Sequence, residues 1–188
     1  MYLRIAAVLG LLSVSTAGPL PCEDVVRPLV LEDFSSILGK WIVIEATVDS
    51  QKYAALLKTV NSAWVEILPT YHNNTAIFNK ANMINGVCSY SPTNISISDS
   101  VVQFTMEGNM TGNSTATFLR TCADCLVMKG TSFLEGHIVR TLHIFGRTGK
   151  LSDFDRKTYR RQVECLGLPQ PNFIHNEKQE LCPQAGLI

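Results

Sequence analysis

The sequence has 188 residues, of which 46% are hydrophobic and 17% charged, and 16 basic residues balance 16 acidic ones. This composition excludes a disordered chain and is sufficient for one domain with a sizeable core. Because the net charge is zero and no basic stripe is present, the electrostatic basis for binding nucleic acids or anionic membranes is missing, and neither partner is expected.

The chain starts like a secretory signal peptide. Residues 1–4 carry a positive charge, residues 5–12 form an apolar run, and residues 15–17 are small, as signal peptidase requires. The apolar run is shorter than the roughly 20 residues that a membrane helix needs, and no later segment reaches that length. We therefore expect cleavage after Ala17, a single domain over residues 18–188, and a monomeric protein secreted into plasma or another body fluid without membrane insertion.

The middle of the chain contains short runs rich in Val, Ile, Thr and aromatic residues, separated by Asn, Gly, Ser or Pro. These runs predict strands over residues 41–48, 63–68, 75–79, 86–90, 95–97, 101–107, 115–120, 126–129 and 137–145. Residues 49–60 have helical propensity and predict a large loop with a helical turn. Strands this short and this closely spaced favour an antiparallel meander, as a sandwich or a barrel.

One amphipathic helix is predicted after the last strand. Ser152 can cap its start, with Asp155 three residues later as the capping partner, and Gly167 is the expected C-terminal stop. Its apolar stripe consists of Tyr159, Val163 and Leu166. Many strands followed by one such helix indicate a barrel with the helix packed on its outside.

Glycosylation sequons and cysteines agree with export. Four sequons without a middle proline begin at Asn73, Asn94, Asn109 and Asn113, and each predicts an N-glycosylation site. The six cysteines are Cys22, Cys88, Cys122, Cys125, Cys165 and Cys182. In an oxidising compartment they predict three disulfides, although six cysteines permit 15 pairings.

Cys122 and Cys125 are only three residues apart and are expected at a hairpin tip. We interpret them as a local structural disulfide, because the sequence provides no βαβ context and no neighbouring helix N-terminus for a thioredoxin-like site. A metal site would need two more convergent ligands, and no histidine lies close in sequence. No metal and no cofactor are expected.

Two motifs resemble the signatures of the lipocalin family. Residues 39–41 (Gly-Lys-Trp) open the first strand like the first signature, and residues 144–148 (Ile-Phe-Gly-Arg-Thr) close the last strand like the third. The second signature is degraded to residues 123–125 (Ala-Asp-Cys). The resemblance implies an eight-stranded antiparallel up-and-down barrel, or calyx, with one C-terminal helix outside. It also implies that Gly39 and Trp41 close the floor and that Arg147 lies across the indole, a cation–π contact of about 0.5–2 kcal/mol.

Over nearly the whole mature chain, the sequence is similar to the α1-acid glycoprotein (orosomucoid) branch of this family, including its fish members that bind tributyltin, saxitoxin or tetrodotoxin. The residues that carry this similarity are residues 21–22, 39–41 and 164–169, Tyr53, Cys88 and Cys182. The resemblance implies the pairs Cys22–Cys165 and Cys88–Cys182, which leaves Cys122–Cys125 as the third. The toxin-binding members contain tandem domains, whereas this chain has one Gly-Lys-Trp and is expected to be a single-domain relative.

Alternation along barrel strands selects the side chains that line the interior. On the first strand, every second residue after Trp41 should face inward, and on the last strand every second residue before Arg147. Tyr53 corresponds to an aromatic residue near the pocket mouth in the resembling branch. The candidate ligand contacts are Val43, Glu45, Tyr53, Val65, Ile67, Phe104, Thr141, His143 and Phe145. Such a pocket is mainly apolar with a few polar groups, as ligand sites usually are.

Glu45 leaves two alternatives open. A carboxylate inside a barrel is costly unless it is hydrogen-bonded or matched by a charge. In one hypothesis it faces the pocket and favours a basic or cationic, toxin-like or xenobiotic-like ligand, with His143 tuning it. In the other, a register slip places Glu45 outside, or water or a tyrosine solvates it.

The function predicted from these features is extracellular carriage or scavenging of a small lipophilic molecule, without catalysis. One alternative is an acute-phase-type glycoprotein that modulates immunity through its glycans and protein contacts, including a cell-surface receptor. A further alternative is a prostaglandin-synthase-like lipocalin. That enzyme needs a free thiol near the second strand, but no cysteine lies between Cys22 and Cys88.

Overall fold

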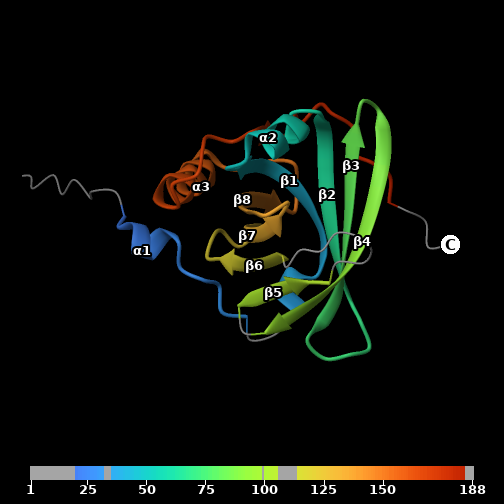
Figure 1. Ribbon diagram of the computed structural model, residues 1–188, viewed down its shortest axis with the longest axis horizontal. Coiled ribbons are helices and arrows are strands. Elements are labelled where there is room, and N and C mark those ends of the chain that lie inside the picture. Colours follow the sequence, from blue (N-terminus) through green and yellow to red (C-terminus); the bar gives the residue numbers. More distant parts are fainter. Residues whose placement is uncertain (1–19, 32–34, 99, 106–113, 185–188) are drawn as a thin grey trace, which may run out of the picture.

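The computed structural model describes residues 20–31, 35–98, 100–105 and 114–184. In these residues, eight antiparallel strands form a barrel that closes where β1 pairs with β2, and a short strand, β9, adds to β1 (Figure 1). The strands are β1 (Gly39–Val48), β2 (Val60–Pro69), β3 (Thr75–Ile84), β4 (Val87–Ser98), β5 (Val101–Phe104), β6 (Ser114–Leu119), β7 (Cys125–Leu134), β8 (His137–Gly146) and β9 (Phe173–Ile174). The predicted eight-stranded barrel is confirmed, with β9 as an addition.

Helical segments lie outside the barrel or at its ends (Figure 1). They are α1 (Cys22–Val25), the 3-10 helix η1 (Ser35–Ile37), α2 (Gln51–Leu57) and α3 (Asp153–Cys165). The helical turn expected between the first two strands is α2. Within the described residues, no helix has the length and apolar character needed to cross a bilayer.

Two tight hairpins lie at the same end of the barrel as α2. The β3–β4 turn is Asn85-Gly86 and the β7–β8 turn is Glu135-Gly136, and all four residues have positive φ. This is the conformation of the two-residue turns whose twist matches that of the flanking strands. We call this the open end, and the end at which β1 begins the floor end.

The prediction of two separate strands over residues 86–90 and 95–97 was wrong. Both belong to β4, which continues through Pro92. β3 pairs with residues 87–96 of β4, whereas β5 pairs only with residues 95–98. Among the described residues, the edge of β4 at Pro92 that faces β5 has no strand partner, so the missing backbone N–H costs no ladder hydrogen bond there.

The main core fills the floor end of the barrel with inward-facing side chains from all eight strands. Trp41, Ile67 and Phe118 are at most 2% exposed. A second cluster lies between the barrel wall and α3. There the buried hydroxyl of Tyr159 donates to the carbonyl oxygen of Leu142 at 2.9 Å, which fixes the helix against β8.

The start of α3 is the one that the sequence predicted. The Ser152 hydroxyl accepts a hydrogen bond from the backbone N–H of Asp155 at 3.1 Å. The helix ends before Gly167, whose φ of 62° suits a residue without a side chain. The Cys22–Cys165 disulfide then joins α1 to the last residue of α3.

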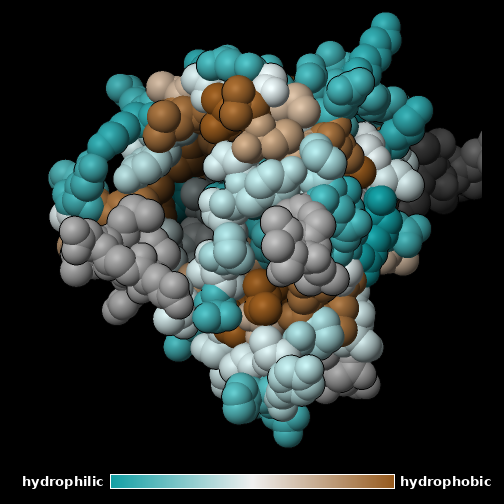
Figure 2. All heavy atoms as spheres, turned by 90° about the vertical axis from the view of Figure 1, so that its right-hand side faces the viewer, coloured by the Kyte–Doolittle hydropathy of each residue, from teal (hydrophilic) through white to brown (hydrophobic). Residues whose placement is uncertain are grey.

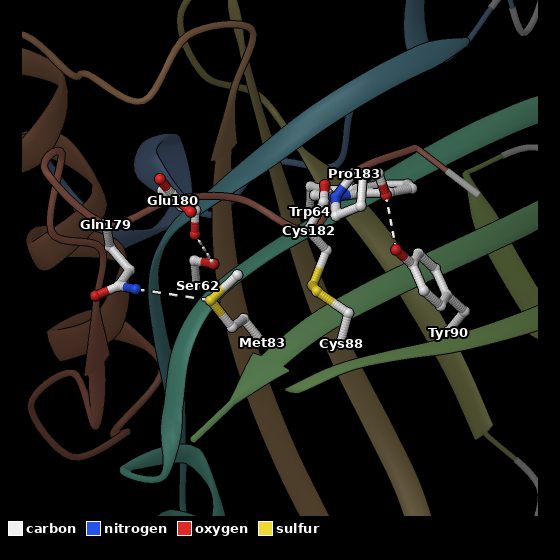
Figure 3. Close-up of a disulfide and its surroundings, with 9 residues drawn as sticks. All are labelled: Ser62, Trp64, Met83, Cys88, Tyr90, Gln179, Glu180, Cys182 and Pro183. Carbon is white, nitrogen blue, oxygen red and sulfur yellow. Dashed lines mark hydrogen bonds between the residues drawn. A yellow bond between two sulfur atoms is a disulfide. The ribbon is translucent and has the colours of Figure 1, made fainter. Parts of the chain in front are cut away.

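Residues 179–183, here called the C-terminal strap, cross the outer face of β2, β3 and β4 (Figure 3). The Cys88–Cys182 disulfide joins the strap to β4. The indole N–H of Trp64 donates to the carbonyl oxygen of Cys182 at 2.8 Å, and the Tyr90 hydroxyl donates to that of Pro183 at 2.9 Å. The strap thus buries Trp64 on the outside of the barrel, where alternation along β2 places it.

Candidate ligand-binding lumen

The floor of the barrel is closed by Trp41 and Arg147. The guanidinium carbon of Arg147 lies 3.5 Å from the centroid of the indole ring. The indole N–H donates to the carbonyl oxygen of Ile37 at 2.8 Å, and Arg147 donates to that of Lys40 at 3.0 Å. Gly39 has a φ of 86°, and a Cβ there would lie only 3.3 Å from Arg147 Nη1, so a residue without a side chain suits this position. The signature residues therefore meet in one structural contact at the floor.

Inward-facing positions towards the open end are accessible to solvent. Thr141, His143 and Phe104 are half-buried, and Lys80 is exposed although its strand register turns it inward. Lys80 pairs with Val65, which pairs with Trp41 of the floor, so these three side chains share the inner face. These inward-facing side chains therefore keep contact with solvent, and we call this accessible part of the barrel interior, above the packed floor, the lumen.

Exposed hydrophobic residues also gather at the rim of this end (Figure 2). Figure 2 views the side that carries β3 and β4 and shows hydrophobic residues at its upper end, bordered by hydrophilic ones. Leu56 of α2 and Val87 of the β3–β4 hairpin are 56% and 70% exposed. The open end therefore combines solvent access with apolar surface.

The predicted ligand contacts separate into a floor group and an upper group. Those buried in the floor core are Val43, Val65, Ile67 and Phe145. Phe104 packs edge-on against Phe78 with centroids 5.4 Å apart and remains partly accessible, as do Thr141 and His143. Tyr53 lies one turn before Leu57 on α2, and Leu57 packs on the barrel core.

Glu45 does not belong to this site, so the hypothesis that it faces the pocket was wrong. A β-bulge separates Val43, which pairs with Phe145, from Glu45, which pairs with Ile144. The extra residue, Ile44, shifts the alternation by one position, so Ile44 and Glu45 both face outward. The sequence alternative of a register slip therefore describes the structure.

Outside the barrel, Glu45 is held by α3. Its fully buried carboxylate accepts hydrogen bonds from Arg156 at 2.6 Å and from Arg160 at 3.2 Å. The two guanidinium groups satisfy a charge that burial alone would make costly. Glu45 therefore fastens the C-terminal helix and contributes no charge to the lumen.

His143 faces the lumen in the predicted orientation. Its ring stacks on Phe145 with centroids 5.9 Å apart. Burial, together with the positive charge of Lys80, lowers the pKa of His143 to about 4, so its imidazole is neutral at pH 7. The Nδ1 atom is buried and has no hydrogen-bond partner.

Lys80 is absent from the sequence-predicted candidates. The predicted third strand ends at residue 79, whereas β3 continues to Ile84. Alternation from Ala76 and Phe78 would have turned Lys80 inward, so the signal was present, but the polar character of residues 79–82 concealed it. Burial lowers the pKa of the Lys80 ammonium from its ordinary value.

The six cysteines all lie in the described part of the chain, and every one is disulfide-bonded. The pairs are Cys22–Cys165, Cys88–Cys182 and Cys122–Cys125. The expectation that no helix N-terminus lies near the last pair was wrong. A carboxylate oxygen of Asp155, in the first turn of α3, lies within 4.8 Å of both sulfur atoms. Because both sulfurs are committed to the disulfide, neither is available as a thiolate ligand for a metal.

Two of the four predicted glycosylation sites can be placed. Asn73 lies in the turn between β2 and β3, Asn94 lies on β4, and both are exposed. Asn109 and Asn113 lie outside the described residues. Exposure of the first two is compatible with attached glycans.

No protein-family model matches the chain. It is 26% identical over 184 residues to saxitoxin and tetrodotoxin-binding proteins 1 and 2 of Takifugu pardalis, an alignment that covers 88% of this chain and 45% of each relative. The chain thus spans about half the length of these curated relatives, and it resembles them as the sequence motifs predicted.

Solved lipocalin structures superpose on the barrel. The siderocalin Ex-FABP matches with a TM-score of 0.66 and 13% identity, over 82% of this chain and 99% of that one. Lipocalin 12 from rat epididymis matches with a TM-score of 0.70 and 10% identity, over 84% and 93% of the two chains. The chain therefore has the lipocalin fold, whereas its assignment to the orosomucoid branch stays a prediction.

Proposed function

From a barrel with the lipocalin fold, we propose that the chain is an extracellular carrier that binds one small, largely apolar molecule in its lumen. The observation that carries the proposal is the accessible inner surface around Phe104, Thr141 and His143, above a floor sealed by Trp41. An apolar cavity with a few polar groups is the usual form of a small-molecule site.

Secretion is part of this proposal. The signal-like residues 1–17, the three disulfides and the exposed sequon residues Asn73 and Asn94 support it. Disulfides persist in oxidising compartments and are rare in the cytosol. Residues 18–188 would then form one glycosylated domain that acts as a monomer.

The names of the relatives support small-molecule carriage in particular. The two Takifugu pardalis proteins are named for binding saxitoxin and tetrodotoxin. We carry over the role of sequestering a toxin-like or xenobiotic-like molecule. The preference for a cationic ligand that depended on Glu45 is not retained, because that carboxylate lies outside the barrel.

Carriage without catalysis is proposed because a synthase-type mechanism lacks its nucleophile. Such an enzyme needs a reactive thiol in the lumen, and a thiol reacts as a free thiolate. Every cysteine of the chain is disulfide-bonded in the structure. His143, whose ring is neutral at pH 7, and the cationic Lys80 remain as groups in the lumen that can bind a ligand.

Binding of the neutral fluorescent amine N-phenyl-1-naphthylamine to the purified, glycosylated protein tests the proposal. We expect a fluorescence increase that saturates at one probe per chain. Ser132 faces inward near the open end, and Thr131 faces outward beside it. Because an indole at residue 132 would obstruct the lumen, Ser132→Trp should weaken binding about tenfold or more, the loss of roughly 1.4 kcal/mol.

Thr131→Trp is the matched control, since it adds the same side chain to the same strand on the outer face. Its probe affinity should equal that of the unchanged protein. Absence of saturable binding by the folded protein, or equal weakening by both variants, would contradict a binding site in the lumen.

A further inference from the structure

Lys80 is a cation in the barrel that has no counter-ion among the residues that the structure describes. Its side chain faces the lumen from the middle of β3, opposite Val65 of the floor core. It makes no ion pair or hydrogen bond with any residue that the structure describes. Water reaches the Lys80 side chain, but partial desolvation by the barrel wall still disfavours its charged form and lowers its pKa.

The described inner wall offers no acid to neutralise it. The register of β1–β8 places no Asp or Glu on the inner face. Glu45 lies outside against α3, and Glu135 of the β7–β8 hairpin is paired with Lys52 at 2.6 Å. In the described residues, the lumen therefore has a positive potential.

His143 adds a second polar group beside this charge. His143 faces the inside of the barrel from β8, where it pairs with Ala46, as Lys80 does from β3, where it pairs with Val65. The positive charge of Lys80 also contributes to lowering the pKa of His143. Its ring is neutral at pH 7, and its unpartnered Nδ1 can carry the N–H that donates to an acceptor. The two side chains together offer a charge and a hydrogen-bond donor to an anion.

Apolar side chains lie on the inner face at the open end, one inward-facing position beyond the polar residues Asn82 of β3 and Thr141 of β8. Ile84 of β3 pairs with Val60 of β2 and with Val87 of β4, so these three side chains share the inner face there. Val139 lies two positions before Thr141 on β8, so it faces the same side of the strand, and it is buried. A ligand with its polar head at Lys80 would place its apolar part along this surface.

We propose that the lumen selects an anionic amphiphile, with Lys80 and His143 binding its carboxylate head and the apolar wall towards the open end binding its tail. This inference rests on the proposed carrier function and names its ligand class. A carboxylate both neutralises the ammonium and accepts a hydrogen bond from the imidazole, which a neutral or cationic head group cannot do.

Three ligands with the same dodecyl chain test the head-group preference: dodecanoate, dodecanol and dodecyltrimethylammonium, each below its micelle concentration. Their affinities are measured by displacement of N-phenyl-1-naphthylamine at pH 7.4. We expect dodecanoate to bind about tenfold or more tightly than the other two, as one charge-assisted hydrogen bond would provide.

Lys80→Met tests the residue, because it removes the charge and keeps an unbranched side chain. It should abolish most of the preference for dodecanoate and leave dodecanol within about threefold of its original affinity. Lys129→Met is the matched control, since Lys129 faces outward on β7 between inward Met128 and Gly130. It should leave all three affinities unchanged.

The failures are distinguishable. If the probe itself does not bind, the carrier function is contradicted. If the probe binds but none of the three ligands displaces it, the amphiphile inference is overturned while carriage stands. If all three bind equally, or if the ammonium ligand binds best, the head-group inference is overturned while carriage stands. A preference for dodecanoate that persists in a folded Lys80→Met variant overturns the role of Lys80. The comparison of the three ligands on the unchanged protein tests the head-group preference whether or not that variant folds.

Discussion

The carboxylate of Glu45 is fully buried and shared by Arg156 and Arg160 of α3. We expect Glu45→Gln to lower the free energy of unfolding by about 1.5–3 kcal/mol, the range for a lost hydrogen bond to a charged group. The value stays below that for a fully buried pair because both arginines keep access to water. Urea unfolding monitored by circular dichroism measures it.

The same variant should leave ligand affinity unchanged, because the bulge in β1 places residue 45 outside the lumen. Glu180→Gln is the control for the change in net charge, since the Glu180 side chain is exposed and only its carbonyl oxygen binds Ser62. A weaker affinity for an apolar probe with unchanged stability would contradict the outward placement of Glu45.

His143 should make stability depend on pH. Its pKa is about 4 in the folded protein and 6.5 as the ordinary value, so the unfolded chain binds more protons between these values. The free energy of unfolding should therefore rise as the pH increases from about 4 to about 6.5. Above that pH, the contribution of His143 should be constant. The contribution lost at pH 4 is at most about 3 kcal/mol. The free energy of unfolding measured from pH 4.5 to 7.5 tests this.

His143→Gln should flatten that dependence, and His72→Gln, in an exposed turn, should not. His175 also has a lowered pKa and contributes in the same direction, but it is present in both variants and cancels from the comparison. Among the described residues, Lys80 is the charged group that shares the inner face of the barrel with His143. Equal slopes for both variants would show that His143 titrates as an exposed histidine.

At the level of elements, the two long-range disulfides hold the chain ends against the barrel. The Cys88–Cys182 bridge spans 94 residues, whereas Cys122–Cys125 spans 3. In the chain-entropy model, replacing the first pair with alanines should cost about 4–5 kcal/mol, and replacing the second about 2 kcal/mol. Urea unfolding of the two double variants gives the comparison.

Loss of the Cys88–Cys182 bridge should also release the C-terminal strap. Trp64 is fully buried under that strap and donates to the carbonyl oxygen of Cys182. Its fluorescence should therefore shift to longer wavelength in the first double variant and stay unchanged in the second. Equal destabilisation by the two double variants, with no spectral change in either, would contradict a strap held by this disulfide.

The elements also show which features the sequence could predict. Hydrophobic alternation located most of the strands, and the Ser152 cap with Gly167 defined α3 because capping depends on local residues alone. The bulge after Val43 was not predictable from local pattern, since a bulge depends on how two strands pair. The same holds for Pro92, which lies on a stretch of β4 that has no partner on the β5 side among the described residues.

At the level of the whole molecule, the floor contact was predicted and the charge of the lumen was not. Trp41 and Arg147 lie far apart in sequence, so only the family resemblance could predict that they meet. The structure confirms the contact. The lumen charge depends on which alternating face of each strand turns inward. A one-residue shift removed Glu45 from the inner face, and a longer β3 added Lys80 to it.

Native mass spectrometry of the glycoprotein, secreted by animal cells and analysed before and after organic extraction, tests the central claim most directly. A carrier should show one small molecule per chain that is lost on extraction, and the extracted protein should then bind one apolar probe. A secreted protein that carries no small molecule, and that binds no apolar probe after extraction, would contradict a ligand-binding lumen.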